Sequence, residues 1–296
     1  MIQDIQPSVF SNAFGTAPPA NNDTVFAFEG GSFMCRDDGG ILTLPSAAEF
    51  WKEGCNGAWR PIRLFSIDDH GFYLAFRDMP TVDDAAASEC TAPVPDAPEV
   101  EGYGWTENAA IRFAEPFALR LAASTALQLS VWYETGRFCG HCGHSMEHDC
   151  NERALACPAC GNRLYPRINP AVIVAVRDND RLLMTRYAGP GAYRHRALIA
   201  GFCEIGETAE QTVAREVLEE AGVRVKNIRY YKSQPWGFAS DLLLGFVCDL
   251  DGSPELHMDG QELSSAEWVA RSDIYEEDDK VSLTREMIVA FKNGLL

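Results

Sequence analysis

The sequence lacks long hydrophobic runs, and no basic residue precedes Arg36. Its apolar runs, such as Ala171–Val176 and Leu242–Leu244, are far shorter than the about 20 residues that a membrane-spanning helix needs. A secretory signal peptide needs a basic start and an apolar core, and the first residues provide neither. We therefore expect a cytoplasmic protein with no membrane partner.

Basic residues are scarce throughout, with 25 Lys and Arg against 43 Asp and Glu and a net charge of −18. Such an acidic surface repels a nucleic-acid backbone at long range. An anionic substrate must therefore be held locally, by metal ions or by a few placed donors. Hydrophobic residues make up 46% of the 296 residues, which is ordinary for a globular chain of about two domains.

Cysteine, in contrast, is plentiful, and its spacing is informative. Ten cysteines without a secretory signal argue against a disulfide framework. Two C-x2-C pairs, Cys139 with Cys142 and Cys157 with Cys160, are fourteen residues apart and offer four thiolates to a tetrahedral zinc ion. Four thiolates close the coordination sphere, so we expect one structural Zn²⁺ per chain and a spare Cys150. Four buried free cysteines, or a redox role for the first pair, are the alternatives.

Patterning outside the cysteine segment predicts a chain of mixed helices and strands. The Pro- and Ala-rich stretch Thr81–Gly102 carries acidic residues and no basic ones, which is typical of an exposed linker. Apolar spacing favours helices over about Pro116–Trp132 and over Leu283–Lys292. We expect strands at Phe72–Phe76, Ala171–Val176, Leu182–Met184, Ala197–Ala200, Ile228–Lys232, Leu242–Cys248 and Ala266–Val269.

A helix with clear ends follows the strand expected at Ala197–Ala200. Thr208 and Gln211 form a capping-box pattern that starts a helix, and Gly222 can end it. One face of this helix is apolar at every fourth position and suits a core, at Ala209, Val213, Val217 and Ala221.

The same helix carries three glutamates at spacings i, i+3 and i+4, namely Glu216, Glu219 and Glu220. Like charges at these spacings destabilise a bare helix by about a few tenths of a kcal/mol per pair. Arg215 can pair with Glu219, but two carboxylates are left uncompensated. A hard divalent cation such as Mg²⁺, which binds carboxylates and substrate phosphates, would relieve the repulsion. A solvated acidic face is the alternative.

The stretch Gly201–Val223 fits the Nudix box, G-x5-E-x7-R-E-U-x-E-E-x-G-U with U aliphatic, at every fixed position. The chain therefore resembles the Nudix hydrolases. The resemblance implies an α/β/α sandwich of the α+β class that binds divalent metals, Mg²⁺ or Mn²⁺. It also implies hydrolysis of nucleoside diphosphates linked to another moiety.

The resemblance also implies roles for individual residues. Glu219 would be a metal ligand, or would orient or deprotonate the attacking water, and Glu207 would brace Arg215 by a salt bridge. The remaining implied metal ligands are Glu216, Glu220, the backbone carbonyl of Ala200 and, beyond the box, Glu262. For Glu262 an isolated surface glutamate is the alternative.

A second motif, Ser233–Asp241, resembles the SQPWPFPxS signature of NADH pyrophosphatases, a subfamily that also has the zinc ribbon. Gly237 and Ala239 replace two prolines of that signature, and Asp241 replaces its last serine. These changes leave the substrate preference less defined than the reaction type.

The chemistry of this motif suits a nucleotide. Trp236 and Phe238 offer flat apolar surfaces on which a base can stack, and Gln234 can hydrogen-bond a carboxamide or base edge. Ordinary core aromatics are the alternative. The resemblance implies that the motif lines the substrate pocket with Gln234, Pro235, Trp236, Gly237, Phe238, Ala239, Ser240 and Asp241. It also implies substrate contacts from the zinc segment, at Glu152 and Tyr165, and a homodimer.

Taken together, these features predict an N-terminal Nudix-like mixed α/β domain over residues 1–134, a small zinc ribbon over 135–167 and a catalytic Nudix domain over 168–296. The resemblance implies hydrolysis of NADH or NAD⁺ to AMP and nicotinamide mononucleotide. Removal of the NAD cap from RNA, or hydrolysis of ADP-ribose or diadenosine diphosphate, are alternatives within the same chemistry. An inactive Nudix domain joined to a zinc-ribbon interaction module is the alternative of another class.

Overall fold

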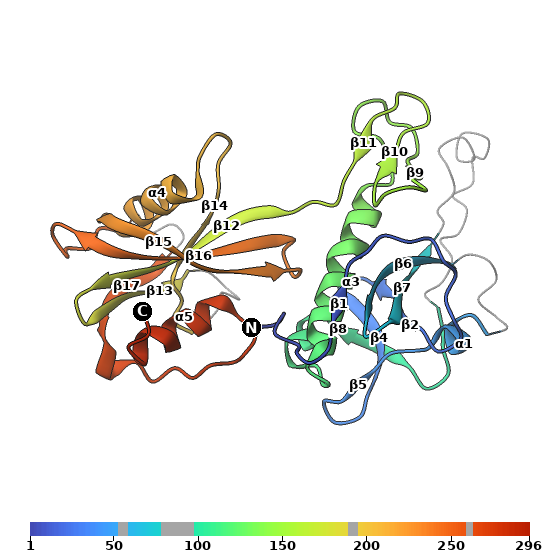
Figure 1. The fold of residues 1–296 in the computed structure, drawn as a ribbon, viewed down its shortest axis with the longest axis horizontal. Coiled ribbons are helices and arrows are strands. Elements are labelled where there is room, and N and C mark those ends of the chain that lie inside the picture. Colours follow the sequence, from blue (N-terminus) through green and yellow to red (C-terminus); the bar gives the residue numbers. More distant parts are fainter. Residues whose placement is uncertain (53–58, 78–97, 189–194, 259–262) are drawn as a thin grey trace. The chain divides into compact units, whose positions relative to one another are not determined.

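The computed structural model describes residues 1–52, 59–77, 98–188, 195–258 and 263–296. The chain divides into two compact units, each traced in Figure 1. The C-terminal unit comprises Met1–Asp4 and Ile168–Leu296, and the N-terminal unit comprises Ile5–Arg167. The cysteine segment thus groups with the N-terminal unit. No pattern in the sequence indicates that the first four residues belong with the C-terminal unit.

The C-terminal unit is built on a mixed sheet in the order β15-β16-β12-β13-β17, with β14 pairing with β12. Strand β12 runs parallel to β16, and the other paired strands are antiparallel. The elements are β12 (Asn169–Asp178), β13 (Arg181–Tyr187), β14 (Ile199–Phe202), α4 (Ala209–Ala221), β15 (Arg224–Trp236), β16 (Asp241–Asp251), β17 (Leu263–Ala270), the 3-10 turn η2 (Arg271–Asp273) and α5 (Leu283–Lys292).

Two hydrophobic cores lie on opposite faces of this sheet. Because side chains alternate along a strand, β12 supplies both cores. Its residues Ala171, Ile173 and Ala175 pack with Met287 and Phe291 of α5. Its residues Val172, Val174 and Val176 pack with Val213 and Val217 of α4. Figure 1 shows α4 and α5 on opposite sides of the sheet, so the expected α/β/α sandwich is confirmed.

Helix α4 has the ends that the sequence predicts. The backbone N–H of Gln211 donates to Thr208 Oγ1 at 3.3 Å, and the N–H of Thr208 donates to Gln211 Oε1 at 2.8 Å. Gly222 ends the helix in a left-handed conformation at φ 71°, with its N–H bonded to the carbonyl of Leu218. The loop before α4 and the strand after it are thereby fixed to the helix.

The N-terminal unit contains two further small sheets, β1-β6-β7-β2 and β3-β4-β5 with β8 beside β4, together with a long helix. A three-stranded sheet, β11-β10-β9, forms the cysteine segment. The linker expected at Thr81–Gly102 lies mostly outside the described residues. The elements are β1 (Phe10–Ser11), β2 (Thr24–Phe26), β3 (Phe28–Glu29), β4 (Ser32–Asp37), β5 (Leu42–Thr43), α1 (Ala47–Phe50), β6 (Trp59–Ile67), β7 (His70–Arg77), β8 (Gly104–Glu107), η1 (Asn108–Phe113), α3 (Ala118–Thr135), β9 (Glu147–His148), β10 (Leu155–Ala156) and β11 (Arg163–Leu164).

The expected likeness of residues 1–134 to a Nudix domain stays a prediction. Among the helices of the described ranges, none is both long enough and apolar enough to cross a bilayer.

Replacing Gly222 with alanine should destabilise the C-terminal unit for two reasons. A side chain in the left-handed region costs about 1–2 kcal/mol. A Cβ here would also lie 2.7 Å from the Cβ of His257 and 2.8 Å from its carbonyl oxygen, which adds overpacking of about 1 kcal/mol or more. Gly294→Ala is the matched control, because Gly294 has φ 72° and its nearest neighbour is 4.0 Å away. Urea unfolding should show the larger loss for Gly222→Ala, and equal losses would contradict the steric argument.

Candidate active site and cysteine centre

Arg215 lies at the centre of the Nudix-box residues and joins the loop, the preceding strand and the helix. Its Nε and Nη2 atoms donate to the two carboxylate oxygens of Glu207 at 2.7 and 3.0 Å. The Nη2 atom also donates to the carbonyl of Phe202 at the end of β14, at 3.0 Å. This bidentate ion pair is the salt bridge that the resemblance implies, and its planar geometry fixes the loop onto α4.

Arg215 also compensates two of the three helix glutamates. Its Nη1 atom donates to Glu216 at 2.8 Å and to Glu219 at 3.0 Å. One guanidinium therefore contacts three carboxylates, and a net negative charge remains at the site. Such a site favours a further cation.

Glu207 is held in its charged form by these contacts. The hydrogen bond from Arg215 lowers the pKa of the Glu207 carboxyl to about 2, and donors from the Glu204 backbone and the Thr212 hydroxyl act in the same direction. Thr212 Oγ1 lies 3.0 Å from Glu207 Oε2. Glu207 is thus a structural anion that orients Arg215, and it does not serve as an acid or base near neutral pH.

The three glutamates differ in exposure, which suggests different roles. The side chain of Glu219 is 60% exposed, whereas that of Glu216 is 12% exposed. Glu220, counted as a whole residue, is only 7% exposed. Carboxylates buried to this degree need strong compensation by cations or hydrogen-bond donors. This burial was not expected from the apolar pattern of the helix.

Gly201 shows how closely Glu216 approaches strand β14. A Cβ built at Gly201 would lie 2.0 Å from the carboxyl carbon of Glu216, so any larger residue would displace that carboxylate. Ala200 is the next residue back along the same strand, where it pairs with Ile173. Hard carboxylate and carbonyl oxygens of this kind fit a divalent ion such as Mg²⁺ or Mn²⁺. Glu262, the further expected ligand, lies outside the described residues.

The second motif forms the hairpin end of β15 and β16. Trp236 pairs with Asp241 across the hairpin, and the rings of Trp236 and Phe238 are 4.8 Å apart at an interplanar angle of 57°. Both rings are half-buried. Asn169 holds the turn, because its backbone N–H donates to Ser240 O at 2.8 Å and its side-chain amide donates to Asp241 at 3.2 Å. The sequence pattern did not single out Asn169, which lies 72 residues from Asp241 along the chain.

Gln234 differs from the expectation for this motif. It is fully buried, its Nε2 atom donates to the carbonyl of Val281 at 2.6 Å, and its Oε1 atom accepts from the N–H of Leu283 at 2.7 Å. Its amide is therefore already used within the domain, and a hydrogen bond to a base edge is not available in this arrangement. Spacing alone could not reveal this, because the partners precede and begin α5.

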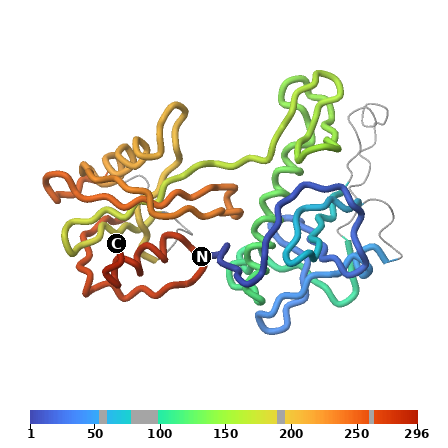
Figure 2. Tube along the Cα trace, in the orientation of Figure 1, coloured from blue at the N-terminus to red at the C-terminus, as the bar shows by residue number. Residues whose placement is uncertain are grey.

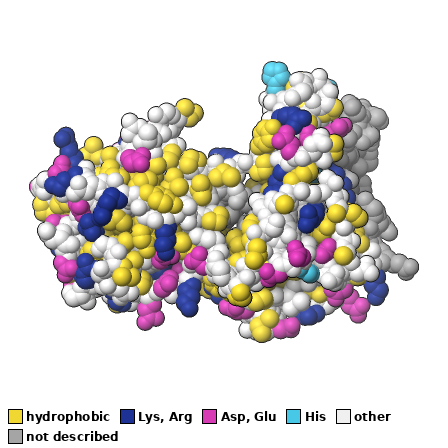
Figure 3. Space-filling model, in the orientation of Figure 1, with side chains coloured by type: hydrophobic (Ala, Val, Ile, Leu, Met, Phe, Trp, Pro, Cys, Tyr) yellow, Lys and Arg dark blue, Asp and Glu magenta, His cyan; other side chains and the backbone are white. Residues whose placement is uncertain are grey.

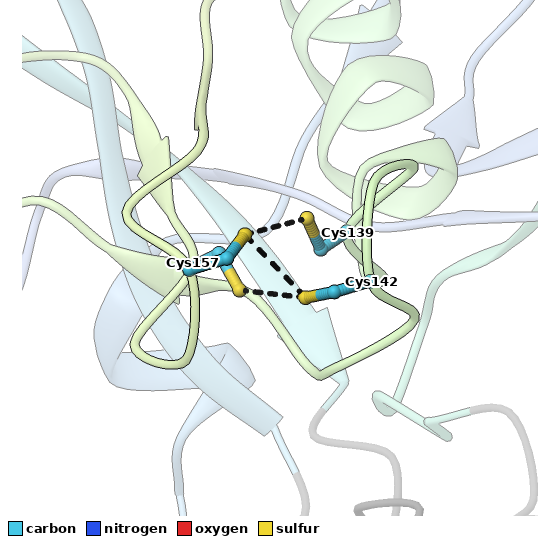
Figure 4. Close-up of side chains that lie close together, drawn as sticks. Cys139, Cys142 and Cys157 are labelled. Carbon is cyan, nitrogen blue, oxygen red and sulfur yellow. Dashed lines mark hydrogen bonds between the residues drawn. The ribbon is translucent and has the colours of Figure 1, made fainter.

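The four predicted zinc ligands come together. The sulfurs of Cys139, Cys142, Cys157 and Cys160 all lie within 4.8 Å of one another. Three of the Sγ–Sγ distances are 3.4, 3.4 and 3.6 Å. A tetrahedron with Zn–S bonds of about 2.3 Å has sulfurs about 3.8 Å apart, so this group has the dimensions of a zinc site. Figure 4 shows the labelled thiols of Cys139, Cys142 and Cys157 pointing toward one another.

The two cysteine turns share one backbone design. Gly143 and Gly161, at φ 80° and 75°, each follow a C-x2-C pair and donate to the carbonyl of its first cysteine. The N–H groups of such a turn point at the sulfur. The backbone N–H of His141 lowers the pKa of the Cys139 thiol, whereas contacts with the neighbouring sulfurs raise the pKa values of Cys142 and Cys160. The four thiols therefore share their protons as one group, and thiolate is the form that binds metal.

Glu152 and Tyr165 lie side by side in the cysteine segment. The Tyr165 hydroxyl donates to Glu152 Oε1 at 3.1 Å, and Arg163 forms an ion pair with the same carboxylate. Arg163 also pairs with Asp149 at 2.9 Å. Tyr165 is 53% exposed, so its ring is accessible. A substrate contact from these two residues stays a prediction.

Comparison with known proteins defines the class of the C-terminal unit. Residues 167–291 match the NUDIX domain family. This match agrees with the resemblance drawn from the box Gly201–Val223, which lies within the matched residues. A NUDIX domain structure from Nitrosomonas europaea, described as a NUDIX hydrolase, is similar at 23% identity with a TM-score of 0.46, over 53% of this chain and 91% of that one.

Curated relatives make the likeness more specific. The chain is 44% identical over 156 residues to "NAD-capped RNA hydrolase NudC" of Enterobacter sp. (strain 638) and to the protein of the same name from Salmonella typhi. The match covers 51% of this chain and 58% of each relative. The chain thus spans a little over half the length of these relatives.

The Glu207–Arg215 ion pair predicts a pH-dependent stability. The pKa of Glu207 is about 2 when folded against an ordinary 4.5, so its contribution is complete above about pH 4.5 and is lost as the pH falls through about 2. Wild type should be more stable than Glu207→Gln near neutral pH, and the gap should close on acidification. Urea unfolding midpoints of both proteins, taken from neutral pH down to about pH 2, measure this difference in stability. Glu204→Gln, which removes an exposed acid from the same loop, is the control. If the stability gap between wild type and Glu204→Gln closes on acidification as well, the cause is a general charge effect, and the assignment to the Glu207–Arg215 pair is contradicted.

Proposed function

We propose that the protein hydrolyses the pyrophosphate bond of NADH or NAD⁺, giving nicotinamide mononucleotide in the corresponding redox state and AMP. The observation that carries the proposal is the arrangement of Arg215 with Glu207, Glu216 and Glu219 inside a NUDIX domain. The relatives are named as hydrolases of NAD-capped RNA, and these names support a substrate with an NAD moiety.

The reaction is the attack of water on one phosphorus of the pyrophosphate, with the bridging oxygen leaving on the other phosphate. Glu216, Glu220 and Glu219, with the Ala200 carbonyl, would hold divalent ions, Mg²⁺ or Mn²⁺. When bound, such ions neutralise the phosphate charge and lower the pKa of water. Glu219, which is exposed, would orient or deprotonate the water. Arg215, through its bonds to Glu207 and Phe202, keeps the loop and helix in register during the reaction.

Base recognition is assigned to the hairpin Ser233–Asp241. The tilted pair Trp236 and Phe238 is half-buried and offers a stacking surface for the nicotinamide or adenine ring. Gly237 and Ala239, in place of two prolines, give this turn more conformational freedom. Asp241 is buried and bonded by Asn169, so its charge does not face the solvent. The changed positions of the motif therefore leave the stacking rings in place.

A second candidate function is removal of the NAD cap from RNA 5′ ends. It uses the same bond, and it is favoured by the names of the relatives. The net charge of −18 opposes general affinity for RNA. Figure 3 shows Lys and Arg scattered among Asp and Glu on the viewed face, with no continuous basic surface. We therefore place hydrolysis of the free dinucleotide first. We also propose a cytoplasmic protein and, as the resemblance implies, a homodimer.

Product analysis tests both candidates. Purified protein with Mg²⁺ or Mn²⁺ should convert NADH to reduced nicotinamide mononucleotide and AMP faster than it converts NAD⁺, ADP-ribose or diadenosine diphosphate. Comparison of NAD with NAD-capped RNA at matched salt separates the second candidate, because RNA affinity through phosphates falls steeply with salt. Metal binding without turnover of any of these substrates would favour an inactive NUDIX domain and contradict the proposal.

Glu220→Gln should lower turnover of NADH by about 100- to 1000-fold, the range seen when one group that stabilises the transition state is removed. The fold should stay intact, because glutamine matches the shape of glutamate. Glu210→Gln is the control, since Glu210 is an exposed glutamate in the first turn of the same helix. Steady-state kinetics with circular dichroism measure both variants. Unchanged turnover in Glu220→Gln would contradict the assigned role.

We also propose that the four clustered cysteines bind one structural Zn²⁺. The geometry of the four thiols supports it. Zinc content by atomic emission should be one per chain in wild type and should fall to near zero in Cys157→Ser. Cys150→Ser, a change in the same segment outside the cluster, should keep one zinc. Loss of zinc from Cys150→Ser, or its retention in Cys157→Ser, would contradict this ligand set.

A further inference from the structure

The first residues of the chain cover the edge of the NUDIX sheet. Ile2 is 1% exposed, and its backbone N–H donates to the carbonyl of Val281 at 3.2 Å. The side-chain amide of Gln3 donates to the carbonyl of Ser233 at 3.2 Å. The contact of Gln3 with Ser233 joins residues 230 positions apart. Figure 2 shows the N-terminus beside the red segment that leads into the last helix.

Strand β15 needs such support because of its position and shape. It is the outer strand of the sheet, and its register with β16 shifts between Lys226 and Arg229 and again between Tyr230 and Ser233. An edge strand has backbone groups without a neighbouring strand, and bulges loosen the pairing further. The second irregularity ends at Ser233, whose carbonyl is the group that Gln3 covers.

Gln3 also contacts the buried Gln234. The Nε2 atom of Gln234 lies 3.4 Å from Oε1 of Gln3, and the same atom donates to the carbonyl of Val281, which also accepts from Ile2. Gln3 and Gln234 therefore connect the end of β15 to the segment that starts α5. Two residues beyond Gln234 is Trp236, the first of the two stacking rings.

We propose that Gln3 is a positioning residue that fixes the substrate-stacking end of β15 through Ser233 and Gln234. The inference rests on the proposed function, because that function assigns base stacking to Trp236 and Phe238. Gln3 does not touch the substrate. Its effect is on how well the two rings are held before binding, so it should alter substrate affinity more than the chemical step.

The test compares Gln3→Ala and Gln3→Glu with wild type. Gln3→Ala removes both amide contacts, and Gln3→Glu keeps the length but replaces the donor to Ser233 with a carboxylate. Both should raise KM for NADH about three- to tenfold, the effect of losing one or two net hydrogen bonds, and leave kcat within about twofold. Amide hydrogen exchange should rise in peptides covering 231–241. Gln6→Ala, an exposed glutamine three residues further on, should change neither quantity.

The outcomes separate the two claims. If wild type hydrolyses NADH but Gln3→Ala has an unchanged KM, or unchanged exchange over 231–241, the positioning role is overturned and the proposed function stands. If kcat falls as much as KM rises, Gln3 acts on the fold of the site as a whole and the positioning role is likewise overturned. If wild type hydrolyses none of the dinucleotides, the proposed function itself fails. A Gln3→Ala protein that melts like wild type with the raised KM supports the inference.

Discussion

The contacts of Arg215 are the constraint on which the rest of the site depends. Glutamates at i, i+3 and i+4 on a helix repel one another, so the helix needs a fixed cation beside them. The guanidinium meets this need because its donors reach three carboxylates and the carbonyl of Phe202 at once. Planar, bidentate pairing with Glu207 also fixes direction, which a lysine could not do. The loop, the strand and the helix are therefore all fixed to the guanidinium of Arg215.

The packing of the α/β/α sandwich holds the helix that carries Arg215 rigidly. Strand β12 is buried on both faces, with alternate residues packed against α4 and α5. Close packing of this kind transmits small displacements instead of absorbing them. Strand β14 pairs with β12, and Gly201 in β14 leaves room only for the carboxylate of Glu216. The separation between helix and sheet is thus set by the core, and the core places the acidic groups at the sheet's backbone.

The sequence predicted the features that are local in the chain. The ends of α4, the limits Leu283–Lys292 of α5 and the four clustered cysteines follow from capping residues, apolar period and C-x2-C spacing. Strand β14 begins two residues later than expected, because pairing with β12 decides its position. The structural use of Gln234 and the contact of Gln3 with Ser233 join distant segments, and no pattern within either segment encodes them. Contacts between segments this far apart in the sequence could not be predicted from local patterns.

The acidic composition is compatible with the proposed anionic substrate if cations are held at the site itself. A net charge of −18 would repel a dianionic dinucleotide if the charge were felt evenly. Screening limits repulsion between exposed charges to about 10 Å at moderate ionic strength, so groups at the site outweigh the distant surface. The carboxylates of α4 would bind divalent cations, and these would supply positive charge at the place where we propose that the phosphates lie. The soft thiolates of the cysteine segment are suited to a different ion. In the proposed function, the aromatic pair of the hairpin would add affinity that does not depend on charge. Because stacking contributes without charge, the precision with which β15 is held matters more in an acidic protein than it would in a basic one.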